Sequence, residues 1–298
     1  MSSRPARRLA AVVALTVVTT ATACGSSSPS SAGAPADYYL SLGDSYAAGY
    51  QPTGTGIGHT TTNGFAYQIV AIAARRGYHF TLANFGCSGA TTGSMLTSVG
   101  CPPISLGPGG ERYPTTTQAA AAEQFLRRHR GHVGLVTISI GGNDVTPCAA
   151  ASDPITCVVS AIGRVQNNLA VLLPALRRAA GASVPIVGTT YPDVLLGLWV
   201  SGDESLAQLS VVAFKTLLNP ALASSYRSIG ATFVDITADS GAYTPLDQTT
   251  TLAPYGTIPV AVARTCELTF FCQLRNIHPT TPGYTVIADA VVATLPRR

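Results

Sequence analysis

Three short glycine-containing turns stand out in this sequence as places where chemistry could occur. They are Gly43-Asp44-Ser45, Gly86-Cys87-Ser88-Gly89 and Gly141-Gly142-Asn143-Asp144, and each follows an apolar run that is typical of a β-strand. The carboxyl ends of parallel strands lie along one edge of a sheet, so Ser45, Gly89 and Asn143 are expected to meet there. A single turn of this kind is often only a helix cap, but three indicate a site.

These residue types suit acyl transfer, which needs a nucleophile, a base and N–H donors for the developing oxyanion. Ser45 supplies a hydroxyl nucleophile. The backbone N–H groups of Ser45 and Gly89 and the side-chain amide of Asn143 can supply the oxyanion hole, and a glycine lets the backbone approach the substrate closely. Asp44 is expected to hydrogen-bond the local backbone.

The base must be one of the five histidines. His278 lies in an Ile-His-Pro turn directly before the last predicted helix, where its backbone is constrained, and it is the expected base. The other four histidines lie in a loop, in a strand or beside a helix end, where surface or helix C-terminal roles are the simpler explanation.

The segments between these residues alternate between strand-like and helix-like runs, which predicts parallel βαβ units in one α/β domain. Strands are predicted at residues 38–42, 78–84, 132–140, 184–190 and 231–236. Helices are predicted at 63–76, 118–130, 162–180 with a kink at Pro174, 206–229, and from a cap at Thr281 with Pro282 in first position. Residues 237–276 show no sustained period, and no repeat or second domain boundary appears.

Composition narrows the class of protein. The chain has 298 residues, 46% hydrophobic and 11% charged, which fits one large domain with a sizeable core and excludes a disordered tail or a coiled coil. The formal net charge is +4, and three of the arginines lie in the first eight residues. A nucleic-acid partner is therefore not expected.

The N-terminus reads as an export signal, because cationic residues 1–8 precede an apolar run, 9–20, too short to span a bilayer. Ala21-Thr22-Ala23-Cys24 fits either an Ala-x-Ala cleavage site or a lipobox whose Cys24 is acylated, and we favour the lipobox. The expected organisation is a signal peptide at 1–23, a Ser/Gly/Pro tether at 24–36 and a catalytic domain at 37–298. The expected location is the outer face of the cell membrane, through the lipid anchor, or the medium.

Seven cysteines would leave one unpaired in an exported chain. Setting Cys24 aside for lipidation leaves six, which allow fifteen pairings. Sequential pairing is the simplest, and it gives Cys87–Cys101, Cys148–Cys157 and Cys266–Cys272. Metal binding is the rival interpretation, but the sequence has no Cys-x-x-Cys and no clustered histidines.

Four segments together resemble the blocks of the SGNH or GDSL hydrolases, in the same order and across nearly all of the predicted domain. They are Gly43-Asp44-Ser45, 84–92, Gly141-Gly142-Asn143-Asp144 and His278-Pro279. The resemblance is closest to the secreted actinobacterial esterase and lipase branch, which is similar in its three local disulfides and its Cys-Ser-Gly-Ala-Thr-Thr block.

This resemblance implies a flavodoxin-like three-layer α/β/α sandwich around a parallel five-stranded sheet. It implies ester hydrolysis through an acyl-serine intermediate, with neither a metal nor an organic cofactor. Carried over by position, Ser45 is the nucleophile, His278 the base, and Ser45, Gly89 and Asn143 the oxyanion hole.

One position departs from the family pattern, because Arg275 stands where an Asp usually orients the histidine three residues later. Our first expectation is that a backbone carbonyl from 269–276, held by the Cys266–Cys272 disulfide, takes that role. The Asn276 side chain is second, and Glu267 or Asp247 is third. The sequence thus predicts a Ser-His dyad with a carbonyl that orients the imidazole.

The leading hypothesis is a monomeric carboxylic ester hydrolase that acts on lipid or short-acyl esters. The first alternative is an O-deacetylase or acyltransferase that works on cell-wall or glycan acyl groups with the same site. The second is a tethered lipoprotein that binds a ligand without turning it over, and the joint presence of Ser45, Gly89, Asn143 and His278 argues against it.

Overall fold

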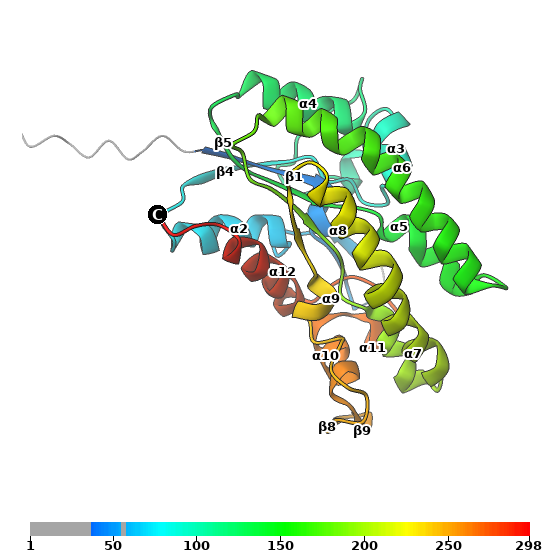
Figure 1. The fold of residues 1–298 in the computed structure, drawn as a ribbon. Coiled ribbons are helices and arrows are strands. Elements are labelled where there is room, and N and C mark those ends of the chain that lie inside the picture. Colours follow the sequence, from blue (N-terminus) through cyan, green and yellow to red (C-terminus); the bar gives the residue numbers. More distant parts are fainter. Residues whose placement is uncertain (1–36, 55–57) are drawn as a thin grey trace, which may run out of the picture. The chain divides into compact units, whose positions relative to one another are not determined.

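The computed structural model describes residues 37–54 and 58–298. The expected signal peptide, tether and acylated Cys24 lie outside the described residues. The described chain forms a parallel five-stranded sheet in the order β4-β1-β5-β6-β7, with helices on both of its faces (Figure 1). The predicted α/β sandwich with a five-stranded parallel sheet is confirmed.

The strands are β1 (Asp37–Gly43), β2 (Tyr50–Pro52), β3 (Gly58–Thr60), β4 (Phe80–Asn84), β5 (Val133–Ser139), β6 (Ile186–Thr189), β7 (Thr232–Val234), β8 (Thr249–Leu252) and β9 (Gly256–Pro259). The α-helices are α1 (Ser45–Ala48), α2 (Phe65–Ala74), α3 (Thr92–Thr97), α4 (Gln118–Arg128), α5 (Gly142–Val145), α6 (Pro154–Ala180), α7 (Glu204–Ala213), α8 (Asn219–Arg227), α9 (Ile236–Asp239), α10 (Val260–Leu268), α11 (Phe271–Leu274) and α12 (Thr281–Ala293). Short 3₁₀ segments are η1 (Pro103–Ser105), η2 (Thr146–Ala150) and η3 (Val194–Ser201), and a π-helical turn, η4 (Phe214–Leu218), joins α7 to α8.

The strand order places the winding reversal beside β1, which lies between β4 and β5. In open α/β sheets this reversal leaves a crevice beyond the carboxyl ends of the two adjoining strands. The last registered pair of β1 and β5 is Gly43 with Ser139, so Ser45 and Asn143 follow neighbouring strands that end at the same level. This topology explains why turns about a hundred residues apart share one site.

Each face of the sheet buries its own apolar core. Leu40 and Leu42 of β1 pack among the inward residues of α4, α6 and α8. Tyr39 points the other way, into a core shared with α2 and α12. A strand buried on both faces has no polar side to alternate with, which accounts for the nearly continuous apolar run of β1.

Helices α6 and α12 are among those that begin earlier than the sequence predicted. Helix α6 starts at Pro154 rather than residue 162, with Asp153 as an N-cap whose side chain accepts from the N–H of Thr156 at 3.1 Å, and it continues through Pro174. The cap of α12 is Thr280 rather than Thr281, since its side chain accepts from the N–H of Gly283 at 3.2 Å.

The segment without a sustained period is ordered rather than irregular. It contains α9, the hairpin β8–β9, α10 and α11. Helix α10 combines three β-branched residues with good helix formers such as Ala and Leu, and it shows no clear amphipathic period of its own. A small apolar cluster that includes Val262 of α10, Leu196 of η3 and Ile258 of β9 supplies the packing that local sequence does not.

Three disulfides join Cys87 to Cys101, Cys148 to Cys157 and Cys266 to Cys272. These are the sequential pairs that the sequence favours. They fit the oxidising environment that an exported protein meets.

Candidate active site

Ser45 is placed by a tight turn between β1 and α1. Gly43 has φ +137°, and a Cβ there would lie 2.0 Å from the carbonyl oxygen of Ser139 on β5, so only glycine fits. Asp44 caps α1, its carboxylate accepting from the N–H of Tyr46 at 2.9 Å. Ser45 is then the first residue of α1, and its side chain faces the rim of the sheet with 6% of the residue exposed.

Ser45 and His278 are in direct contact although 233 residues separate them. Ser45 Oγ lies 2.8 Å from His278 Nε2, and His278 Nδ1 lies 2.7 Å from Asn276 Oδ1. The same Asn276 oxygen accepts from the backbone N–H of His278 at 3.1 Å, which fixes the orientation of the amide. Nδ1 therefore carries the proton, and the lone pair of Nε2 points at the serine hydroxyl.

The expectation that a backbone carbonyl orients His278 is wrong, because the partner of Nδ1 is the side chain of Asn276. Arg275 adopts a left-handed conformation, with φ +53°, at the end of α11. Its guanidinium lies over the ring of Phe271, 5.6 Å from the centroid. This turn brings the next residue, Asn276, under the imidazole, and the position that usually carries Asp points elsewhere.

The histidine loop is also held by aromatic residues that the sequence did not single out. The hydroxyl of Tyr46 donates to the carbonyl oxygen of Ile277 at 2.5 Å, which links the residue after the nucleophile to the residue before the histidine. The ring of Tyr50 lies 4.3 Å from that of His278, centroid to centroid. Burial among these groups lowers the pKa of His278 to about 4, so the imidazole is neutral at pH 7.

The turns that carry Gly89 and Asn143 are fastened to each other. The Asn143 amide nitrogen donates to the carbonyl oxygen of Ala90 at 2.9 Å. Asp144 accepts from the N–H of Thr92 at 2.9 Å and from its hydroxyl at 2.7 Å. Asp144 is a supporting residue that sequence reasoning did not assign, although it follows Asn143 directly.

The same turns are tied to the nucleophile, because the N–H of Cys87 donates to the carbonyl oxygen of Gly43 at 3.0 Å. Gly89 has φ +86° and open space where a Cβ would stand. Within residues 37–54 and 58–298, no acceptor pairs with the backbone N–H of Ser45 or of Gly89. Both N–H groups are therefore free to donate to a ligand.

Asp44 supports the turn that carries the nucleophile, and it also borders the pocket beside Ser45. Its second oxygen accepts from the hydroxyl of Tyr191 at 2.6 Å, in addition to the local backbone bond that the sequence predicts. Burial raises the pKa of Asp44 to about 7, and the ring of Tyr191 packs edge-on against Tyr46 at 4.9 Å.

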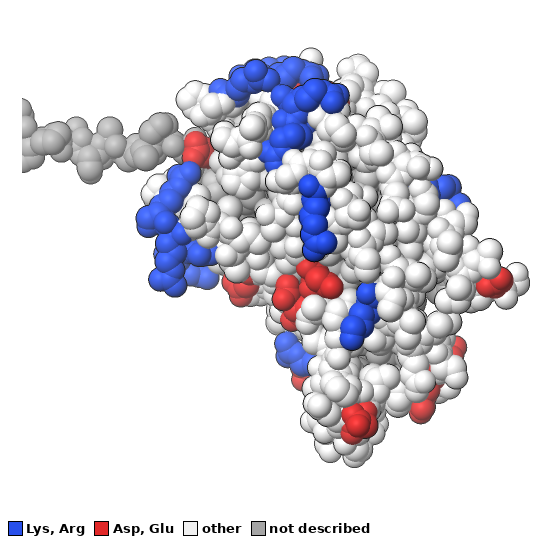
Figure 2. Space-filling model, viewed as in Figure 1, with Lys and Arg blue, Asp and Glu red and all other residues white. Residues whose placement is uncertain are grey.

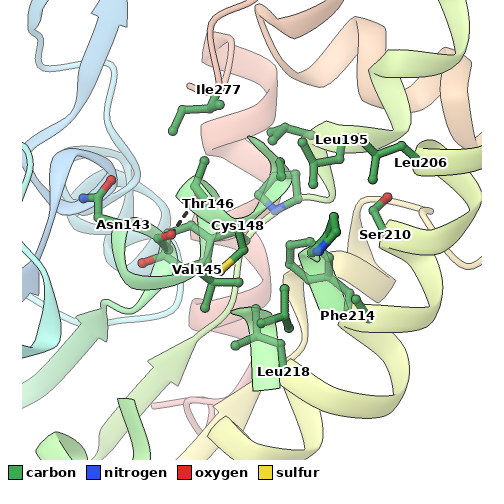
Figure 3. Close-up of a pocket in the computed structure, with 18 of the residues that line it drawn as sticks. Asn143, Val145, Thr146, Cys148, Leu195, Leu206, Ser210, Phe214, Leu218 and Ile277 are labelled. Carbon is green, nitrogen blue, oxygen red and sulfur yellow. Dashed lines mark hydrogen bonds between the residues drawn. The ribbon is translucent and has the colours of Figure 1, made fainter. Parts of the chain in front are cut away.

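An apolar pocket opens beside Ser45. Figure 3 shows Asn143 on one side of it and Leu206 and Phe214 on the other. Its walls come from η2, the first turns of α6, the start of η3, and the α7–η4 segment. The π-helical turn η4 adds Phe214 and Leu218 to the wall, as such turns often do at functional sites.

The apolar run at residues 194–200 contributes both to the pocket wall and to core packing. Val194 and Leu195 line the pocket, whereas Leu196 is fully buried in the cluster with α10. Among the described residues no group of His, Cys, Asp and Glu side chains is arranged to hold a metal ion.

Comparison with solved structures agrees with this fold. A phospholipase A1 from Streptomyces albidoflavus NA297 is similar over 87% of this chain and 100% of its own, with 17% identity and a TM-score of 0.53. A lipase from a goat rumen metagenome is similar over 86% of this chain and 96% of its own, with 15% identity and a TM-score of 0.53. No curated protein sequence matched.

A family model supplies the assignment. The model of the GDSL-like lipase/acylhydrolase family matches residues 41–286, a range that begins in β1, just before Ser45, and ends beyond His278. The chain belongs to the GDSL-like lipase/acylhydrolase family and is a hydrolase that acts on esters.

Proposed function

We propose that the protein is a serine esterase or lipase that cleaves carboxylic esters with an apolar acyl chain through an acyl-Ser45 intermediate. The observation that carries the proposal is the 2.8 Å contact of Ser45 Oγ with a neutral His278 at the mouth of an apolar pocket. A hydroxyl, a base held by a third group and an adjoining cavity are the parts that nucleophilic acyl transfer requires.

The reaction follows from these positions. As Ser45 Oγ attacks the ester carbon, its proton passes to His278 Nε2, and the carbonyl oxygen becomes an oxyanion. The N–H groups of Ser45 and Gly89 and the amide of Asn143 donate to that oxyanion. The C–O bond to the alcohol then breaks, and the alcohol leaves with the proton from Nε2. Water repeats the sequence on the acyl-serine and releases the acid.

Asn276 acts on the base rather than on the substrate. Its Oδ1 accepts the Nδ1 proton at 2.7 Å and keeps the imidazole in the tautomer that accepts from serine. A neutral amide stabilises the imidazolium less than a carboxylate would. The partial burial of His278 is then compatible with a low pKa, because Asn276 places no negative charge beside the ring.

The pocket favours an ester hydrolase for apolar acyl groups over the O-deacetylase alternative. Most of its lining is aliphatic, including Val158, Leu195 and Leu209, and an acetyl group is too short to contact more than a small part of that lining. Burial of each additional methylene contributes about 0.8 kcal/mol. We therefore expect kcat/KM to rise with acyl length from acetate toward medium-chain esters.

Covalent labelling tests the nucleophile. A fluorophosphonate should modify Ser45, as located by peptide mass spectrometry, and S45A should lose both the label and about 10⁴-fold or more of p-nitrophenyl ester turnover. S88A is the matched control, since Ser88 stands in the neighbouring turn and should label as the unsubstituted protein does. Unchanged turnover by S45A would rule the assignment out, and preference for an acetylated sugar would favour the deacetylase.

The proposal includes export as a lipoprotein, with residues 1–23 removed, Cys24 acylated and residues 24–36 as a tether. The three disulfides support an oxidising location. The intact mass of the protein from its native host distinguishes the two forms, because acylation adds long-chain mass to a chain that begins at Cys24. A mature chain that begins at Cys24 without added mass indicates a secreted form.

A further inference from the structure

We infer that the edge of the sheet opposite the active site is a docking surface for an anionic phospholipid membrane. Ten arginines lie at this edge, at or just beyond the last turns of five helices. They are Arg75, Arg76, Arg127, Arg128, Arg130, Arg177, Arg178, Arg227, Arg297 and Arg298. We call this set the basic edge.

The fold explains why these arginines gather. Helices α2, α4, α6 and α8 each lead into the amino end of a parallel strand, namely β4, β5, β6 and β7, so their C-termini all lie at one edge. The chain's C-terminus reaches the same edge, since Arg298 contacts Asp37 at the start of β1 at 3.3 Å. The helix dipole favours cationic side chains at helix C-termini. The dipole therefore explains why arginines occur at these helix ends, but it does not explain why so few acidic residues accompany them.

Acidic residues do not balance the basic edge. Three acidic residues, Asp37, Glu123 and Asp289, lie within five positions of these helix ends or at the start of β1, and Asp37 and Glu123 are each paired with an arginine there. The other described residues include five basic and eleven acidic side chains. In Figure 2 the blue side chains gather over the ends of α2, α4 and α6, and most of the red atoms lie in the lower half of the view, from α9 to the β8–β9 hairpin and across to α7. The domain is therefore polarised, with a net positive edge and a net negative active-site side.

Part of the basic edge is rigid and part is free to bind. Arg177 donates to the carbonyl oxygen of Ile229 at 3.1 Å, and Arg130 donates to that of Arg178 at 3.2 Å, so these side chains join neighbouring helix ends. Arg75, Arg128 and Arg297 are exposed, and within residues 37–54 and 58–298 their side chains have no hydrogen-bond or ion-pair partner. These three are available to an external anion.

A membrane fits this arrangement better than a soluble polyanion. The arginines come from helices on both faces of the sheet, so the charge spreads over a broad edge, and a planar anionic surface meets all of it at once. The chain also enters the domain there, at Asp37, thirteen residues after the expected acylated Cys24. A tether of that length reaches about 45 Å when fully extended, which keeps the edge near the membrane that holds the anchor.

Docking by this edge would orient catalysis. Strand β1 has seven residues, which span about 20 Å at roughly 3.3 Å each, and Ser45 lies beyond its far end. The proposed catalytic pocket would then face away from the docking membrane, toward esters that arrive from outside it. This consequence rests on the proposed function, whereas the docking itself does not.

Vesicle binding of the mature chain, which begins at residue 24 and carries Cys24→Ala to remove any acyl anchor, tests the inference. We compare R75Q/R128Q/R297Q with R112Q/R164Q/R264Q, a control that removes the same charge from exposed arginines away from the basic edge. Each arginine at an anionic surface contributes roughly five- to tenfold in affinity. The basic-edge triple should thus bind phosphatidylglycerol vesicles roughly a hundredfold more weakly than the control triple, and p-nitrophenyl ester turnover should be equal in both.

Three results would overturn the inference. The first is equal vesicle binding by the two triples. The second is equal binding to phosphatidylcholine and phosphatidylglycerol vesicles at low salt, where charge attraction is strongest. The third is tighter binding to soluble heparin than to anionic vesicles, which would assign the edge to a polyanion. Because S45A leaves the basic edge intact, its vesicle binding should be unchanged, so failure of the esterase proposal and failure of this one are distinguishable.

Discussion

Asn276 Oδ1 lies 2.7 Å from His278 Nδ1 and 3.1 Å from the backbone nitrogen of the same histidine. One amide oxygen thus orients both the ring and the chain that carries it, in a place where a charged carboxylate is the more familiar partner. The base is therefore held in position without a buried negative charge beside it.

Removing that amide oxygen should impair catalysis more than binding. We expect N276A to lower kcat on the order of 10²-fold with KM within about twofold, because the ring loses its tautomer and its orientation. Steady-state kinetics with a p-nitrophenyl ester measure both kcat and KM. A variant with unchanged kcat would show that another group orients His278.

N276D should move the pH profile. The neutral imidazole is the form that accepts the serine proton, and the pKa of His278 is lowered to about 4. The kcat/KM of the unsubstituted enzyme should therefore fall only below about pH 5. A carboxylate beside Nδ1 favours the imidazolium and raises the pKa, so the acid limb of N276D should shift upward by one unit or more. An unshifted limb would place the titrating group elsewhere.

Tyr46 should act as a positioning residue for the histidine loop, because its hydroxyl donates to the Ile277 carbonyl oxygen. We expect Y46F to lower kcat about tenfold with little change in KM, since a small displacement of the base is costly in the transition state. Y39F is the matched control, because Tyr39 is also fully buried and loses a hydroxyl hydrogen bond, to Thr137, far from Ser45. Equal losses of kcat in the two variants would indicate a general structural effect.

The position of the candidate catalytic residues could be predicted from the sequence because it depends on the topology of the sheet. Ser45, Gly89 and Asn143 each follow a strand, and a parallel sheet brings strand ends to one edge whatever the loops do. The partner of His278 could not be predicted, because it depends on the left-handed backbone of Arg275, a conformation that arginine rarely adopts. The start of α6 was missed although Asp153-Pro154 is a recognisable cap and first-turn pair.

Tertiary contacts explain why the ordered elements within residues 237–276 were not predicted. Helix α10 is stabilised by Val262 and Cys266, which pack into a cluster with η3, and the Cys266–Cys272 disulfide joins it to α11. Such long-range stabilisation leaves no periodic signal in the local sequence.

Filling the apolar pocket should shorten the preferred acyl chain. Ala213 lines the pocket at the end of α7, and A213F would place a ring in the space that the acyl chain is proposed to occupy. We expect kcat/KM for a medium-chain p-nitrophenyl ester to fall about tenfold or more, with acetate turnover nearly unchanged. V171F is the control, because Val171 is 62% exposed on α6 and is absent from the pocket lining. A uniform loss across chain lengths would contradict an acyl-binding role.

Asp193 should make stability depend on pH. The side chain is fully buried, accepts from Ser210 at 2.8 Å and from the N–H of Leu195 at 3.1 Å, and burial raises its pKa to about 7. The folded state therefore holds one more proton than the unfolded state between about pH 4 and pH 7. Its stabilising contribution is full below pH 4 and is lost as pH rises toward 7, at up to about 1.4 kcal/mol per pH unit.

D193N should remove that slope, since an amide does not titrate and its oxygen still accepts from Leu195. Urea unfolding at pH 4.5 and pH 8 measures the free energy of unfolding. The parent and the variant both contain Asp44 and His278, so the difference between the two proteins reports the titration of Asp193 alone. We expect D193N to gain stability relative to the parent as pH rises from 4.5 to 8. D289N is the control, because Asp289 is exposed on α12. A parent-minus-variant difference that stays constant with pH would show that Asp193 ionises in the folded protein as readily as it does in the unfolded chain.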